Sequence, residues 1–333
     1  MAKPVRIGMI SFEHMHGMKY AQAVTEIPEA ELVAVWHHDA FRGTEMATKF
    51  QTRYVPDYQA ILESDVDGVI ICSNNRDHEK YTIAAARAGK HIMVEKPFAT
   101  SMAGARRMVG ACREAGVKLA TAFPMRHAAP MKRLKGLVQA GTIGQVLAIC
   151  GTNHGKMPGG WFIDPALSGG GAVIDHTVHV SDLMLWITGA NATEVYAEMD
   201  CLLHPIGVDD VGMLTVSFDS GAFATIDTSW VHPNETYPIW PDVYLQVIGT
   251  DGVLTADAFG QIFATYNEST RKVTHVHWGS DPDFWLVHDF IGAIGDDREP
   301  LATGVDGMRA SEIAIAAYAS ARAGRPVPLP LTD

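Results

Sequence analysis

The first 124 residues alternate short apolar segments with segments of helical pattern, and this alternation constrains the fold more than any other feature. The apolar segments are 5–10, 32–36, 68–71, 91–94 and 118–122, and the helical ones are 17–25, 41–50, 82–88 and 101–115. Strands that are apolar throughout belong to a parallel sheet covered by helices on both faces. We therefore predict an α/β domain over residues 1–124, built on a doubly wound parallel sheet of the Rossmann-like kind.

From residue 125 onward the pattern changes, because turns rather than helices separate most of the apolar segments. The predicted strands are 194–199, 212–218, 222–229, 243–249, 252–256 and 272–278, and the predicted helices lie at 130–141, 178–187 and 307–323. Consecutive strands of this kind pair antiparallel, so we predict an α+β domain over residues 125–333 with a large open, mostly antiparallel sheet. Its uncovered face predicts a homodimer or homotetramer formed through this sheet.

Composition excludes several classes of partner. The 26 basic and 38 acidic residues give a net charge of −12, which disfavours binding to a nucleic-acid backbone. No segment reaches the roughly 18 uninterrupted apolar residues of a membrane span, and residues 1–14 lack a signal-peptide pattern. The four cysteines, Cys72, Cys112, Cys150 and Cys201, form no C-x-x-C pair. We therefore expect a cytoplasmic protein with no nucleic-acid or membrane partner.

The segment between the first strand and the first helix is where a dinucleotide fold carries G-x-G-x-x-G. Here the three glycine positions hold Ser11, Glu13 and His16. Side chains at these positions hinder the approach of a pyrophosphate, so this loop alone is weak evidence for NAD or NADP. The helix that begins at Gly17 still offers backbone N–H groups. Since like charges repel, we expect Glu13 to point away from the phosphates, so that Glu13→Gly leaves dinucleotide affinity unchanged or improves it.

The second strand also departs from the usual pattern. A dinucleotide fold places an acidic residue after this strand to bind the ribose hydroxyls. Here His37 and His38 precede Asp39. His37 is therefore either a contact to the adenosine end of the cofactor, tolerant even of a 2′-phosphate, or a partly exposed loop residue, and the choice between NAD and NADP stays open.

Several motifs further along the chain resemble one family. The segment 72–78 reads CSNNRDH, and the segment 91–97 reads HIMVEKP, a strand ending in Glu-Lys-Pro. Other matching segments are 123–126 (FPMR), 141–146 (GTIGQV), 161–165 (WFIDP), 168–171 (SGGG), 175–182 (DHTVHVSD) and the ending AIAAYASARAGRPVPLPL. Together they resemble the glucose–fructose oxidoreductase, inositol dehydrogenase and rhizopine-catabolism family (Gfo/Idh/MocA) over essentially the whole chain.

The resemblance implies an NAD(P)-dependent oxidoreductase that acts on a secondary hydroxyl of a sugar, sugar acid or cyclitol. Such chemistry needs a base for the hydroxyl proton and a cation for the developing oxyanion. The implied catalytic residues are Lys96, Asp175 and His179: Lys96 polarises the reacting oxygen, and Asp175 orients the acid/base His179. Lys96 follows a parallel strand at its carboxyl end, where ligands bind. Asp175 and His179 are four residues apart and share one face of a helix.

Wider sites follow from the motifs together with the position of the first loop. The candidate cofactor-binding residues are Ser11, Phe12, His14, Met15, His37, Ser73, Asn75, His78, Glu95, Lys96 and Arg126. The candidate substrate-binding residues are Lys96, His154, Trp161, Asp175, His176 and His179. Several have structural alternatives: Glu95 and Arg126 also suit ion pairs, and Trp161 also suits domain packing. A divalent metal held by His154, Asp175, His176 and His179 is disfavoured, since adjacent helical residues point about 100° apart.

Two other functions remain open on sequence alone. The first is a redox-neutral sugar hydrolase, eliminase or isomerase that recycles its NAD or uses none. The second is a sugar-sensing protein whose nucleotide site has degenerated. The unusual loop at 11–16 keeps both open, whereas the Lys96, Asp175 and His179 set argues against the sensor. Binding of NAD(H) or NADP(H) distinguishes these functions.

Overall fold

The computed structural model describes residues 3–238, 241–267, 269, 271–277, 279 and 281–332. It divides into two compact units. The first comprises Met1–Pro124 and Pro282–Met308, and the second comprises Met125–Asp281 and Arg309–Asp333. The break after Pro124 lies where the sequence pattern changes. Residues 282–308, which we expected in the second domain, instead pack with the first unit.

The first unit is built on a parallel sheet with the strand order β3-β2-β1-β4-β5-β6. Its strands are β1 (Val5–Ile10), β2 (Ala30–Trp36), β3 (Arg53–Tyr54), β4 (Gly68–Ile71), β5 (His91–Val94) and β6 (Leu119–Thr121). Each neighbouring pair is parallel. The predicted doubly wound Rossmann-like sheet is confirmed. The apolar pattern did not predict its short edge strand β3.

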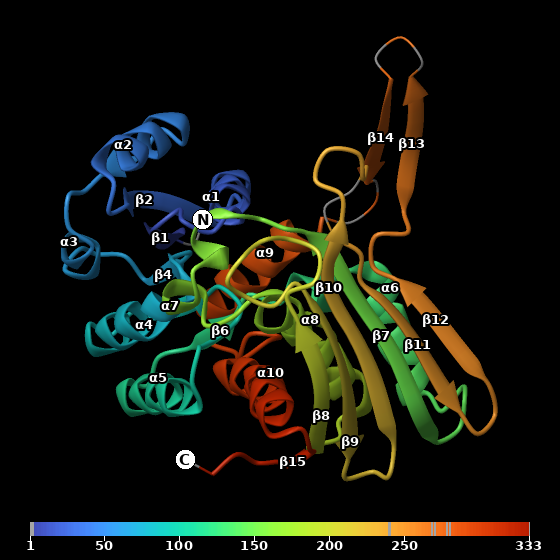
Figure 1. Cartoon of the computed structure of the whole chain (residues 1–333). Helices are drawn as coiled ribbons and strands as arrows, with labels where there is room; N and C mark the ends of the chain where they lie inside the picture. The colour runs from blue at the N-terminus through green and yellow to red at the C-terminus, as the bar shows by residue number, and fades with distance from the viewer. Residues whose placement is uncertain are drawn as a thin grey trace. The chain divides into compact units, whose positions relative to one another are not determined.

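Helices cover both faces of this sheet, as Figure 1 shows. One face packs against α1 (Gly17–Glu26), α2 (Ala40–Lys49) and α9 (Pro282–Gly295), and the other against α3 (Gln59–Leu62), α4 (His78–Arg87) and α5 (Met102–Ala115). The helix α9 accounts for the reassignment of residues 282–308. Its buried residues Leu286, Val287 and Phe290 share one apolar core with Ile7 and Met9 of β1, and burying that surface stabilises the unit.

The second unit contains a seven-stranded mixed sheet with the order β12-β11-β7-β10-β9-β8-β15. Its strands are β7 (Val146–Lys156), β8 (Ala192–Asp200), β9 (Val211–Phe218), β10 (Phe223–His232), β11 (Tyr244–Gly249), β12 (Val253–Asp257) and β15 (Val327–Pro328). Among the strands described, β7 and β10 form the one parallel pair of this sheet, so the prediction of a mostly antiparallel sheet is confirmed.

Helices of the second unit pack on one face of its sheet. Apolar residues of α6 (Ala129–Gln139), α8 (Ala172–Thr188) and α10 (Gly304–Ala323) form a single core with the strands. A separate hairpin, β13 (Ile262–Asn267) and β14 (Lys272–His277), extends away from the sheet (Figure 1). The predicted strand 272–278 corresponds to β14, and its last residue, Trp278, lies outside the described residues.

In the part of the chain that the structure describes, we find no helix that combines the length and the apolar character of a membrane span.

Candidate active site

The loop between β1 and α1 adopts the backbone that glycine usually provides, although it contains no glycine before Gly17. Ser11, at the first glycine position, has a φ of 72°, in the left-handed region that non-glycine residues rarely occupy. Its N–H donates to the carbonyl of Trp36 at 2.8 Å, and the N–H of His14 donates to the carbonyl of Cys72 at 3.0 Å. The loop is therefore fixed to the ends of β2 and β4.

The N-terminus of α1 is suited to an anion. The residue before the helix, His16, makes no side-chain cap, and the first turn contains no acidic residue. The first backbone N–H groups of a helix have no partner within the helix, and the helix dipole places partial positive charge there. This is the position at which a dinucleotide fold binds its pyrophosphate.

A buried ionic cluster lies beneath this loop. The carboxylate of Glu95 accepts hydrogen bonds from its neighbouring Lys96 N–H at 2.5 Å, from His16 Nδ1 at 2.8 Å and from the Tyr20 hydroxyl at 2.8 Å. Burial by itself would raise the pKa of Glu95, but His14 and His16 outweigh it and hold that pKa well below its ordinary value. The carboxylate is thus an internal anchor that ties the end of β5 to α1.

The same cluster raises the pKa of His16. Burial lowers the pKa of His16, but the carboxylate of Glu95 more than compensates, so that the net pKa is raised above 6.5. The pairing therefore favours the charged form of both groups, an imidazolium beside a carboxylate.

Lys96 follows β5, and its side chain is buried, with 4% of its surface exposed. The next residue, Pro97, is held by His78, whose Nδ1 lies 3.0 Å from the Pro97 carbonyl. Burial lowers the pKa of His78 despite this bond, so its ring is neutral and Nδ1–H donates. The Asn-x-x-His motif therefore positions the turn that carries the candidate catalytic lysine.

The remaining candidate cofactor residues differ in how they are placed. Phe12 is buried and stacks on Phe50, with the ring centroids 6.4 Å apart, so its side chain belongs to the core. Met15 is 43% exposed, whereas the side chains at the ends of β2 and β4 are buried: His37, Ser73 and Asn75.

In the second unit, the glycine-rich segment before α8 is required by close packing. A Cβ on Gly171 would lie 1.8 Å from the carbonyl oxygen of Asp209, which no side chain can occupy. The same Asp209 caps the helix, because its carboxylate accepts from the N–H groups of Gly171 and Val173 at 3.0 and 2.8 Å. Tyr318 adds a further hydrogen bond to Gly171 and donates to Asp209 at 2.6 Å. The helix consequently begins at Ala172, six residues before our predicted start.

This early start adds Asp175 and His176 to the helix that carries His179, and all three residues are buried. His176 Nδ1 lies 2.9 Å from the carbonyl of Asn153, so that nitrogen donates and fixes the ring. Its Nε2 lies 3.2 Å from Asp175 Oδ2. The structure thus brings the adjacent pair Asp175 and His176 together, although their helical positions diverge.

His154 lies away from this group. His154 follows Asn153 along β7, so their side chains point to opposite faces of the sheet. The side chain of His154 lies on the face away from α8. Its Nδ1 lies 2.8 Å from Asp242 Oδ2, and its Nε2 lies 3.1 Å from Asp227 Oδ2. These two carboxylates raise the pKa of His154 to about 10, against a smaller opposing effect of burial. The structure does not place His154 beside Asp175 and His176.

Trp161 and Arg126 have structural partners. Trp161 stacks on Phe162 at 3.8 Å, within a partly buried apolar group. Arg126 is buried and donates hydrogen bonds to the carboxylate of Asp182 on α8. The donors are its Nε and one terminal nitrogen, at distances between 2.6 and 3.1 Å. Its guanidinium also lies over Trp186 at 5.6 Å.

Two groups in the described part of the chain have donors close enough to share a metal ion. They are His14, His16 and Glu95 in the first unit, and His154, His232 and Asp242 in the second. The donor atoms of each group lie within 4.8 Å of one another. In both groups the imidazoles already pair with carboxylates. The metal arrangement that we considered around Asp175 and His179 is not among them.

Some residues of the site were missed by sequence reasoning. His16 and Tyr20 are four residues apart on α1, and this spacing was a signal that both could reach one partner. Asn74, which binds Glu13, lies within the motif at residues 72–78. Asp209 and Tyr318 gave no local signal, because they are distant in sequence from the helix that they cap.

Family models match both halves of the chain. Residues 5–123 match the oxidoreductase family with an NAD-binding Rossmann fold, and residues 131–255 match the GFO/IDH/MocA C-terminal domain. An uncharacterized oxidoreductase of Bacillus subtilis, YrbE, is 30% identical over 100% of this chain and 99% of its own length. The chain belongs to the Gfo/Idh/MocA oxidoreductase family.

Other relatives agree with this assignment. Myo-inositol 2-dehydrogenase of Thermotoga maritima is 29% identical over 98% of each chain. Among solved structures, GenD2 from gentamicin A biosynthesis, crystallised with NAD, superimposes with a TM-score of 0.91 at 27% identity and covers 99% of this chain and 98% of its own. The protein is therefore an oxidoreductase with an NAD-binding Rossmann domain, and the fixed loop and the N-terminus of α1 described above fit that cofactor.

Proposed function

We propose that the protein is a dehydrogenase for a secondary hydroxyl of a sugar, sugar acid or cyclitol, with NAD(H) or NADP(H) as the hydride carrier. The observation that carries the proposal is the buried polar group of α8, Asp175, His176 and His179. A carboxylate and two imidazoles buried within five residues of one helix are the groups that proton transfer to and from a hydroxyl requires. Relatives that act on inositols support the substrate class.

The nicotinamide cofactor, when bound, supplies hydride acceptance or donation. The protein supplies the other elements. His179 removes the hydroxyl proton during oxidation and returns it during reduction, and Asp175 orients His179. Lys96 stabilises negative charge on the reacting oxygen. In this proposal the first unit is the cofactor-binding domain, and the second is the substrate-binding domain.

Exchanging His179 for asparagine tests the acid/base assignment. Asparagine keeps polarity and approximate size but exchanges no proton near neutral pH, so we expect kcat to fall about a hundredfold. The measurement is NADH formation with a panel of inositols, aldoses and sugar acids. His288→Asn, at an exposed position on α9, is the matched control and should retain full activity. Unchanged turnover in His179→Asn would remove this histidine from the mechanism.

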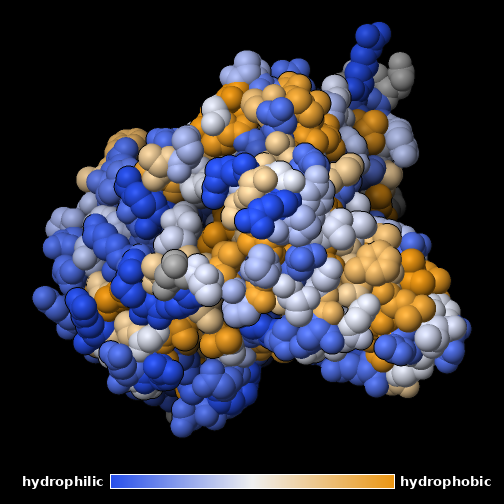
Figure 2. Space-filling view, turned by 60° about the horizontal axis from the view of Figure 1, so that its bottom comes forward, coloured by the Kyte–Doolittle hydropathy of each residue, from blue (hydrophilic) through white to orange (hydrophobic). Residues whose placement is uncertain are grey.

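We also propose that the protein is a homodimer or homotetramer formed through the open face of the seven-stranded sheet. Register places the exposed residues Met213, Phe223, Tyr244 and Val253 on this same face. Their exposed fractions range from 37% to 59%. On the side of the molecule that it displays, Figure 2 shows hydrophobic residues at the surface among hydrophilic ones. An extended sheet face with such side chains is typical of a protein interface.

A charge on this face should prevent association. Phe223→Glu adds a carboxylate to a side chain that is 53% exposed, so the fold has room for it while an apolar interface does not. We expect light scattering after size exclusion to show a shift to a smaller species. Phe41→Glu, at an 83% exposed position on α2, is the matched control. An identical mass for wild type and Phe223→Glu would exclude this face as the interface.

We further propose that the protein resides in the cytoplasm. All four cysteines are unpaired thiols, which suits a reducing compartment.

A further inference from the structure

The end of β2 does not supply the acidic group that usually binds the adenosine ribose. The first acidic residue after the strand, Asp39, caps α2 instead, and its Oδ1 accepts from the N–H groups of Phe41 and Arg42 at 2.8 and 3.1 Å. The position nearest the strand holds His37. A fold that takes NAD normally places a carboxylate here, whereas an arginine accommodates the 2′-phosphate of NADP.

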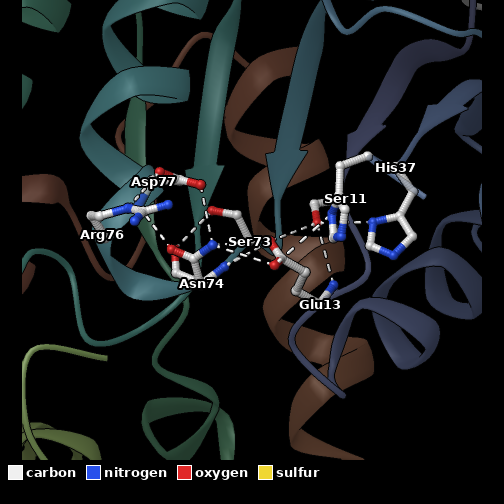
Figure 3. Close-up of polar contacts among 8 residues, drawn as sticks. Ser11, Glu13, His37, Ser73, Asn74, Arg76 and Asp77 are labelled. Carbon is white, nitrogen blue, oxygen red and sulfur yellow. Dashed lines mark hydrogen bonds and ion pairs between the residues drawn. The ribbon is translucent and has the colours of Figure 1, made fainter. Parts of the chain in front are cut away.

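A carboxylate reaches this region from a different element. Glu13, in the loop after β1, accepts from the N–H of Asn74 at 3.1 Å and from the Asn74 side-chain amide at 3.2 and 3.3 Å. The Ser11 hydroxyl donates to Glu13 at 3.4 Å and lies 3.3 Å from His37 Nδ1. Figure 3 shows these side chains as a connected row across the ends of β4, β1 and β2.

Hydrogen bonds fix the Glu13 carboxylate, but part of it stays exposed to solvent. Its side chain is 18% exposed, and one carboxylate oxygen lies 3.9 Å from Nδ1 of the exposed His38. The carboxylate is therefore held by the loop after β4, directed toward the end of β2, and accessible to a ligand.

The surrounding charges disfavour a phosphate at this place. Arg42 pairs with Glu45 at 2.7 Å, and Arg76 pairs with Asp77 at 3.1 Å. Burial, with a contribution from His38, lowers the pKa of His37, so the imidazole is neutral near pH 7 and offers no charge to a 2′-phosphate. A dianionic phosphate would meet the Glu13 carboxylate without a compensating cation from His37.

We propose that Glu13 replaces the missing acidic residue of β2, accepts a hydrogen bond from the adenosine ribose, and selects NAD(H) against NADP(H). This inference rests on the NAD(P)-dependent activity proposed above and adds the choice of dinucleotide. It also revises our expectation for Glu13→Gly. The hydrogen bonds to Asn74 and Ser11 give Glu13 a place in the site, so we now expect that substitution to weaken NADH binding.

Glu13→Gln is the direct test, because it removes the charge and keeps the size. Dissociation constants for NADH and NADPH are measured by fluorescence titration. The wild type should prefer NADH by about tenfold or more, and Glu13→Gln should reduce that preference to about threefold or less, chiefly through tighter NADPH binding. Glu26→Gln, at the opposite end of α1, makes the same change of charge and should leave the preference unchanged.

A second measurement needs no variant and applies if Glu13→Gln fails to fold. The wild type is titrated with 5′-AMP and with 2′,5′-ADP as competitors of NADH, and 5′-AMP should compete about tenfold better.

Three results would overturn the inference. The first is a wild type that binds NADPH as tightly as NADH. The second is a folded Glu13→Gln variant that weakens both dinucleotides equally, because that is the result of a purely structural role. The third is a wild type that binds neither dinucleotide, and only this result also contradicts the proposed function.

Discussion

Lys96→Met is expected to reduce turnover about a thousandfold while the protein still folds and still binds its dinucleotide. Lys96 is 4% exposed, and methionine fills a similar volume without adding a group that needs a hydrogen bond. The backbone N–H of residue 96 continues to donate to Glu95, so the ionic cluster below the loop keeps this contact. The fall in turnover therefore comes from the missing ammonium group, which would otherwise stabilise negative charge on the reacting oxygen.

The measurement is kcat on the best substrate of the panel, together with the dissociation constant for NADH. We expect the dissociation constant for NADH to change by less than about threefold, which is less than about 1 kcal/mol of binding free energy. Lys19→Met, at a side chain that is 65% exposed, is the matched control and should keep its turnover. Turnover near that of the wild type in Lys96→Met would refute the catalytic role of this lysine.

Arg126→Met is expected to produce the largest loss of stability, about 3–5 kcal/mol in the free energy of unfolding. The substitution leaves the carboxylate of Asp182 buried, with 1% of its side chain exposed, and removes its bidentate partner. A buried charge without compensation is among the most destabilising changes in a protein interior. Urea unfolding, followed by circular dichroism, measures the effect.

The double variant Arg126→Met with Asp182→Leu separates the ion pair from simple loss of packing. Because it removes both charges, it should recover most of the stability that the single variant loses. The same proteins address the candidate cofactor role of Arg126: if the ion pair is its function, NADH affinity in the folded single variant stays near that of the wild type. A single variant as stable as the wild type would contradict the assignment.

The fold was largely predictable because its local patterns are strong. Apolar segments such as 68–71 and 91–94 are buried on both faces, which only a covered parallel sheet provides. Helix α5 shows the same agreement, since Ser101 caps its start and Gly116, with a φ of 66°, ends it. Where the start of a helix depends on residues distant in sequence, as with Asp209 at α8, the prediction was late by six residues.

Sequence motifs named candidate residues for the site but did not indicate their contacts. The resemblance to the family singled out Lys96, Asp175 and His179 as candidates, and the structure buries all three. The motifs did not indicate that His154 lies on the opposite face of its strand, bound by Asp227 and Asp242, since both carboxylates come from other parts of the sheet. Contacts between distant segments depend on strand register, which a single sequence does not specify.

The sequence by itself therefore determined the two kinds of sheet and the family, and it named candidate catalytic residues, because periodicity and short motifs are local properties of the chain. Only the tertiary structure decided that residues 282–308 pack with the first unit, that Ser11 takes the left-handed backbone of a glycine, and that Glu13 is fixed by Asn74. Each of these depends on groups brought together by folding. The physical reason is that packing and hydrogen bonding act on distance in space, whereas a sequence pattern records only distance along the chain.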